Sequence, residues 1–95
     1  MKWIETIDLR ASSFNSETVI SEILSVLNEI SDETIKDSVK LYSHIGIRTD
    51  FSIHISHENE EIEIAGTKLG HFIADDLKRF GLVNHYVWVE VGLTP

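Results

Sequence analysis

The stretch VKLYSHIGIRTDFSIHI, residues 39–55, decides the fold, because apolar and polar side chains alternate along it in two runs. Alternation with a period of two is typical of strands that turn one face to a core and the other to solvent. The residues Arg48–Asp50 separate the two runs, so the stretch predicts a β-hairpin. Keeping both apolar sets on one face pairs Ile47 with Phe51 across a three-residue loop.

The segments on either side of this hairpin predict two helices and two further strands. One apolar stripe follows the N-cap residue Asn15, and another follows Gly66-Thr67. Alternation predicts a first strand at residues 3–10 and a last strand at residues 86–91. We expect Gly81 to end the second helix in the left-handed conformation that suits a glycine. The chain therefore reads strand, helix, hairpin, helix, strand.

This order predicts an α+β fold that occupies residues 1–95 as a single domain. Right-handed crossovers give a four-stranded antiparallel sheet in the order 4-1-3-2, with both helices on one face. The other face is then open. Its expected residues are Thr6, Asp8, Arg10, Tyr42, His44, Ser52, His54, Ser56, Tyr86, Trp88 and Glu90.

The βαββαβ order over essentially the whole chain resembles the ferredoxin-like superfold. The half-polar, half-aromatic open face is similar to that of the dimeric α/β-barrel group within it. This resemblance implies that two subunits pack their sheets face to face, so we expect a homodimer. It also implies the activities of that group, which includes cofactor-independent monooxygenases and isomerase-like enzymes. Regulatory domains of ACT type have the same topology and remain an alternative. RNA-recognition domains also share it, but their basic and aromatic motif is absent from this sequence.

The aromatic residues and histidines of the open face predict a pocket for a small organic ligand. The candidate residues are Tyr42, His44, His54, Tyr86 and Trp88. Aromatic walls with a few polar groups are typical of such pockets, and the imidazole of His54 or His44 would serve as a base near neutral pH. No stretch matches a catalytic signature, so no catalytic residue is assigned and no cofactor is expected. Because the same aromatics suit a protein interface, a non-catalytic assembly module is the alternative.

Metal binding is the less favoured interpretation of the same face. In the predicted hairpin register His44 lies directly across from His54, and Asp8 and Glu90 share their face. Half-exposed sheet faces often carry histidine without a metal, and periodicity does not fix the lateral alignment that four ligands need. We therefore expect no metal.

Polar residues elsewhere are expected to have structural roles. The segment Gly66-Thr67-Lys68 at a helix start could hold an anion, but helix capping explains it better. Glu5 falls on the helix-facing side of the first strand, where we expect Ser43 or water to satisfy it. The remaining histidines are expected at the surface or its boundary, namely His57, His71 and His85.

Composition argues against two classes of partner. The chain has 95 residues, with 8 Lys and Arg scattered among 16 Asp and Glu, and a formal net charge of −8. A phosphate-rich surface would repel it, so we expect neither nucleic acid nor membrane as a partner. The absence of cysteine leaves the compartment undecided on redox grounds. The absence of an apolar run in the first ten residues predicts a cytoplasmic protein. A chain this short buries a limited core, which also favours self-association.

Overall fold

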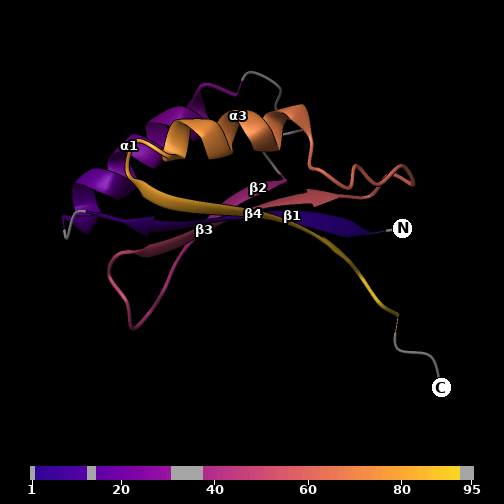
Figure 1. Ribbon diagram of the computed structural model, residues 1–95, viewed down its shortest axis with the longest axis horizontal. Helices are drawn as coiled ribbons and strands as arrows, with labels where there is room; N and C mark the ends of the chain where they lie inside the picture. Colours follow the sequence, from indigo (N-terminus) through magenta and orange to yellow (C-terminus); the bar gives the residue numbers. More distant parts are fainter. Residues whose placement is uncertain (1, 13–14, 31–37, 93–95) are drawn as a thin grey trace.

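The computed structural model describes residues 2–12, 15–30 and 38–92 and confirms the predicted βαββαβ order (Figure 1). Its elements are strand β1 (Trp3–Ala11), helix α1 (Ser16–Asn28), strands β2 (Val39–Ser43) and β3 (Asp50–His57), helix α3 (Lys68–Leu77) and strand β4 (Gly81–Val89). The strands form one antiparallel sheet in the order β2-β3-β1-β4, which is the predicted 4-1-3-2 order read from the opposite edge. The α+β fold class is therefore confirmed.

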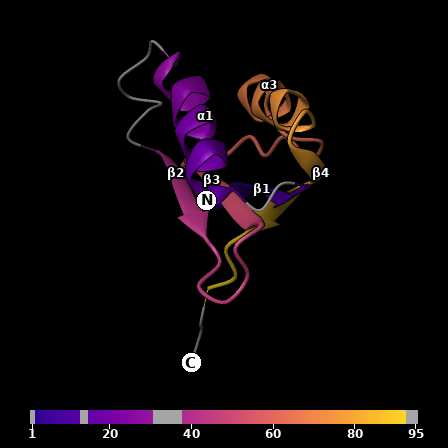
Figure 2. The ribbon, with the colours of Figure 1, turned by 90° about the vertical axis from the view of Figure 1, so that its left-hand side faces the viewer.

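Both helices cover the same face of the sheet, as predicted (Figures 1 and 2). The core lies between the two layers, because alternate residues of β1 and β3 meet the apolar stripes of α1 and α3 there. Its buried members are Ile7, Leu9, Ala11, Val19, Ile23, Ile30, Phe51, Ile53, Ile55, Ile73, Ala74 and Leu77. In residues 2–12, 15–30 and 38–92 no helix lies on the opposite face, and no helix is long and apolar enough to cross a membrane.

Both helices begin at the predicted caps. The side chain of Asn15 accepts a hydrogen bond from the backbone N–H of Thr18 at 3.2 Å. At the second helix, the hydroxyl of Thr67 accepts from the N–H of Gly70 at 3.0 Å. Each cap satisfies a backbone donor that the first helical turn leaves without a partner.

The end of α3 differs from the prediction at Gly81. Its φ is not positive, so Gly81 does not end the helix in the left-handed conformation. It is instead the first residue of β4 and pairs with Ala11. A Cβ at this position would overlap the backbone of Arg10, so the glycine permits close strand contact. Strand β4 therefore begins before Tyr86, the predicted first residue. This earlier start was not predicted because the polar residues Asn84 and His85 obscure the alternation.

The register of the hairpin also differs from the prediction. Ser43, not Ile47, pairs with Phe51, and the loop extends over residues 44–49. The two registers differ by an even number of positions, and an even slip keeps every side chain on its original face. Alternation therefore predicted the face of the paired strand residues but could not choose between these registers. Ile45 and Ile47, expected on the apolar face, lie in the longer loop and are exposed. The longer loop projects on the open side of the sheet (Figures 1 and 2).

Candidate functional site

Two rows of side chains cross the open face next to the hairpin loop. The first, hereafter the floor row, crosses all four strands and consists of Tyr42, Ser52, Asp8 and Asn84. The second, hereafter the rim row, consists of His44, Asp50, Arg10 and Leu82. His44 belongs to it because its backbone N–H donates to the carbonyl of Asp50 at 2.9 Å. Both rows line an open groove of about 610 Å³.

Tyr42 provides an aromatic wall at one end of the floor row. Its side chain is 47% exposed, and its ring packs against the ring of His54 with centroids 4.5 Å apart. This contact limits the positions that the tyrosine ring can take. A half-exposed aromatic ring that is already supported by a neighbour is a suitable surface for the apolar part of a ligand.

Asp8, in the middle of the floor row, is a carboxylate that forms no ion pair with a described residue. Its Oδ1 accepts a hydrogen bond from the hydroxyl of Ser52 at 2.7 Å. None of the ion pairs among the described residues involves Asp8. An ionised carboxylate can accept about four hydrogen bonds, so most of the acceptor capacity of Asp8 is unused within the described chain.

Arg10, although adjacent to the groove, already pairs with Asp50. The guanidinium donates from Nε to Oδ1 at 3.0 Å and from Nη2 to Oδ2 at 2.9 Å. This hydrogen bonding and the charge of Asp50 raise the pKa of Arg10, and Arg10 in turn lowers the pKa of Asp50. The two opposite charges therefore neutralise each other at the rim of the groove.

His44 forms a turn at the start of the hairpin loop. Its Nδ1 accepts a hydrogen bond from the backbone N–H of Gly46 at 2.9 Å. In a neutral imidazole the proton then resides on Nε2, which makes that nitrogen a donor. The turn ends β2 and leaves Ile45 fully exposed. In this conformation neutral His44 offers the groove a hydrogen-bond donor and not a base.

The five predicted ligand residues share the open face but lie in different rows. Tyr42 and His44 line the groove. His54 and Tyr86 flank Thr6 in the neighbouring row. Trp88 lies beyond them, donates from Nε1 to the hydroxyl of Thr6 at 2.9 Å, and lines a separate pocket of about 430 Å³. The sequence therefore places these residues on the open face, but the structure does not bring them into one pocket, and His54 and Tyr86 line neither of the two.

The predicted pairing of His44 with His54 is wrong. Lys40 pairs with His54, because the hairpin register differs from the expected one. Along the strand direction, the row that contains Asp8 lies between the row of His44 and the row of His54. Glu90 follows the end of β4. Across the described ranges no group of three or more His, Asp and Glu residues is arranged to hold a metal ion. The hairpin register thus removes the geometric basis of a site shared by the two imidazoles.

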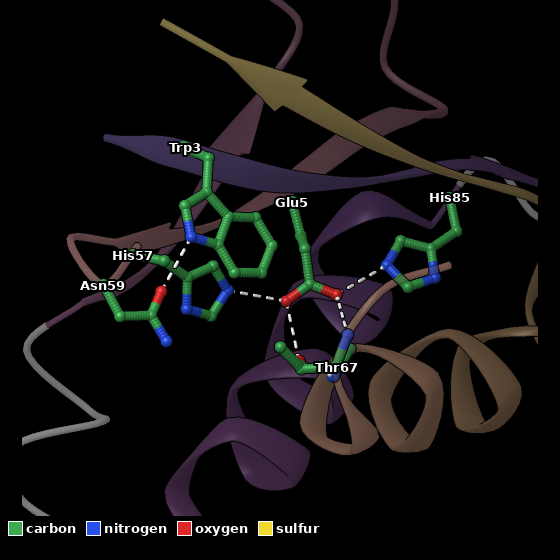
Figure 3. Close-up of polar contacts among 7 residues, drawn as sticks. Trp3, Glu5, His57, Asn59, Thr67 and His85 are labelled. Atoms are coloured by element: carbon green, nitrogen blue, oxygen red, sulfur yellow. Dashed lines mark hydrogen bonds and ion pairs between the residues drawn. The ribbon is translucent and has the colours of Figure 1, made fainter. Parts of the chain in front are cut away.

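A second polar cluster, not foreseen from the sequence, lies on the helix-covered face (Figure 3). Its centre is the fully buried carboxylate of Glu5. This carboxylate accepts hydrogen bonds from His57 Nε2 at 2.7 Å, His85 Nε2 at 2.9 Å, and the N–H and hydroxyl of Thr67 at 2.8 and 2.7 Å. Because an ionised carboxylate only accepts, both imidazoles act as donors. We refer to Glu5, His57, Thr67 and His85 as the Glu5 network.

The hydrogen bonds of the Glu5 network keep its carboxylate ionised. Burial alone would raise the pKa of Glu5, but the hydrogen bonds from Thr67, His57 and His85 outweigh it and hold the pKa below its ordinary value of 4.5. The N-terminal end of α3 also favours a negative charge. The anion at this helix start is therefore a carboxylate of the same chain, and neither Ser43 nor water is needed to satisfy Glu5.

Two glycines make room for the buried carboxylate. Gly66 has a φ of 95°, a conformation that other residues rarely adopt, and a Cβ there would overlap the ring of His85. A Cβ on Gly70 would overlap the carboxylate of Glu5. The helix can approach β1 this closely only because both positions lack a side chain.

Trp3 and Asn59 support the network on one side. The indole ring stacks on the imidazole of His57, with centroids 4.0 Å apart, and its Nε1 donates to Asn59 Oδ1 at 2.7 Å (Figure 3). The sequence did contain a signal for this cluster. Glu5 and His57 both occupy helix-facing positions of the period-two pattern, so two polar side chains at core positions needed partners there.

No family model matches this chain, and no curated protein or solved structure is significantly similar to it. The choice between the two clusters therefore depends on geometry. The Glu5 network is buried and bonded within the chain, whereas the groove is open and its central carboxylate has unused acceptor capacity. We take the groove as the candidate functional site.

Proposed function

We propose that this protein binds a small organic ligand in the groove lined by the floor row and the rim row. The observation that carries the proposal is the floor row itself, in which Tyr42 supplies an aromatic wall and Asp8 and Asn84 supply polar groups. Small-molecule sites commonly have volumes of about 300 to 1,000 Å³ and combine apolar walls with a few placed polar groups. The groove, at about 610 Å³, has both properties.

We also propose that the protein is a cytoplasmic homodimer of the dimeric α/β-barrel type. Tyr86 and Trp88 lie on the open face, are 45% and 55% exposed, and have ring centroids 5.9 Å apart. Exposed aromatic pairs are favoured anchors of protein interfaces. If two sheets pack face to face, a partner subunit covers these rings and closes the groove over its ligand.

The second candidate function is a non-catalytic assembly module. Tyr86 and Trp88 favour it, because they lie outside the groove and serve no ligand there. In that case the open face exists only to pair with another copy or with a partner protein. A monooxygenase-like or isomerase-like enzyme has less support, because the ring of His44 would first have to release Gly46 before it could act as a base in the groove.

The two exposed tyrosines of the open face provide a matched test. Tyr42 and Tyr86 are 47% and 45% exposed, but only Tyr42 lines the groove. We would screen small aromatic fragments by NMR on ¹⁵N-labelled protein and measure the oligomeric state by analytical ultracentrifugation. We expect Tyr42→Ala to abolish fragment-induced shifts in the floor row with the dimer retained. We expect Tyr86→Ala to weaken the dimer while the floor row still responds to fragments.

The same experiment separates the two candidate functions. If no fragment shifts the floor row in the wild type, ligand binding is contradicted and the assembly module is favoured. If Tyr42→Ala binds fragments as the wild type does, the groove is not the binding site. A wild-type protein that stays monomeric at high concentration contradicts the proposed homodimer.

A further inference from the structure

The charges that line the groove leave one carboxylate unbalanced. In the described part of the chain, the groove contains Asp8 and Asp50 but only one permanent cation, Arg10. Arg10 contacts both carboxylate oxygens of Asp50, at 3.0 and 2.9 Å. His44, the imidazole that lines the groove, uses Nδ1 to accept from the N–H of Gly46. The groove therefore has a net negative charge centred on Asp8.

The position of Asp8 favours pairing with a cation from outside the chain. Its only hydrogen-bond donor among the described residues is Ser52, a neutral group at 2.7 Å. The carboxylate is half-buried between β3 and β4, so a pair formed with it would be screened less than a fully exposed pair. The net charge of −8 also raises the local concentration of cations and repels anions.

The position of Tyr42 indicates that such a ligand also has an apolar group. It lies in the same row as Asp8, with one strand between them, which corresponds to roughly 10 Å across the sheet. The exposed ring can contact an apolar body and attract a positive charge through its π face. A molecule with a cationic group at one end and a ring at the other fits this spacing.

We infer that the ligand of the groove is a small organic ammonium compound whose cation pairs with Asp8 and whose apolar body lies against Tyr42. This inference rests on the proposed function, and it names the chemical class that the groove selects. Asn84, at the far end of the floor row, supplies a further hydrogen-bonding group close to the cation. The neutral tautomer of His44 and the neutralised Arg10 leave the groove without a free charge for a carboxylate ligand.

Three probes that share one phenyl group and differ in their head group test this inference. They are phenethylamine, 2-phenylethanol and phenylacetate, titrated at neutral pH into ¹⁵N-labelled protein and followed by NMR. We expect saturable shifts in the floor row with phenethylamine, binding roughly tenfold weaker with the alcohol, and no binding of the acid, because a charge-assisted contact contributes about 1.4 kcal/mol or more. We expect Asp8→Asn to reduce the affinity for phenethylamine to that for the alcohol.

A charge-matched control separates direct pairing from a general electrostatic effect. Glu90→Gln removes one negative charge outside the groove, and we expect it to leave the phenethylamine affinity nearly unchanged. Equal affinities for the amine and the alcohol would overturn the inference while groove binding itself stands. Tighter binding of phenylacetate would overturn it in favour of Arg10 as the recognition group. If none of the three probes shifts the floor row, the inference fails, and the fragment screen then decides separately whether the groove binds any ligand.

Discussion

Strand β1 carries two carboxylates, Glu5 and Asp8, which differ in burial and in hydrogen bonding. Glu5 and Asp8 are an odd number of residues apart and therefore lie on opposite faces. Glu5 is fully buried and accepts four hydrogen bonds from described residues, whereas Asp8 is half-buried and accepts one from them. The difference indicates that the first carboxylate organises the fold and that the second is available to a ligand.

The largest expected effect follows the removal of the buried carboxylate. We expect Glu5→Ala to lower the free energy of unfolding by about 3 kcal/mol, because it leaves His57 and Thr67 without their acceptor and opens a cavity. Asp8→Ala should cost about 1 kcal/mol or less, because it removes one hydrogen bond from a half-exposed site. Urea denaturation of both variants measures the difference. Equal losses would contradict the contrast between the two carboxylates.

A smaller loss is expected when the space beside Glu5 is filled. Alanine normally stabilises a helix relative to glycine, yet we expect Gly70→Ala to destabilise the protein by about 2 kcal/mol, because the new Cβ overlaps the Glu5 carboxylate. Gly92→Ala is the control, because nothing lies within 4 Å of a Cβ there. If Gly70→Ala raises the urea midpoint, α3 does not approach β1 as closely as described.

The lowered pKa of Glu5 predicts a pH dependence with a definite sign. The folded protein binds this proton less readily than the unfolded chain, so the ionised carboxylate stabilises the fold above its ordinary pKa of 4.5 and loses that effect as the pH falls through the folded pKa. The difference in unfolding free energy between the wild type and Glu5→Gln should therefore shrink as the pH drops below about 4.5. Urea denaturation at pH 7, 5 and 3.5 tests this. A constant difference would show that Glu5 does not titrate as inferred.

The smallest effect on stability is expected at the rim of the groove. Arg10 and Asp50 form an exposed pair, and such pairs contribute little, so Arg10→Gln should leave the urea midpoint nearly unchanged. The variant should nevertheless bind phenethylamine more tightly than the wild type does, because the charge of Asp50 is no longer neutralised. Calorimetric titration measures this change. Weaker binding would indicate that Arg10, and not Asp8, governs the groove.

Periodicity predicted the fold where the structure depends on which face a side chain occupies. Ile7, Leu9, Ile53 and Ile55 are buried under the helices as expected, and Asp8, Tyr42 and Trp88 lie on the open face. It failed where an even shift leaves the pattern unchanged, as at Ser43 opposite Phe51. It also missed the early start of β4, where the alternation passes through Asn84 and His85.

The sites were predictable to different degrees. Tyr42 and His44 could be placed beside the groove because they belong to one strand and its loop. The Glu5 network could not be assembled from the sequence, because it joins β1, the end of β3, the start of α3 and β4. Only the polar identity of residues at core positions indicated that such a cluster exists.

A crystal structure of the protein grown with phenethylamine is the most direct test of the groove as a ligand site. We predict the amine nitrogen within hydrogen-bonding distance of the Asp8 carboxylate, the phenyl ring against Tyr42, and the hydrogen bonds of the Glu5 network unchanged. A groove that contains no amine and is filled instead by side chains of a second copy would contradict the account.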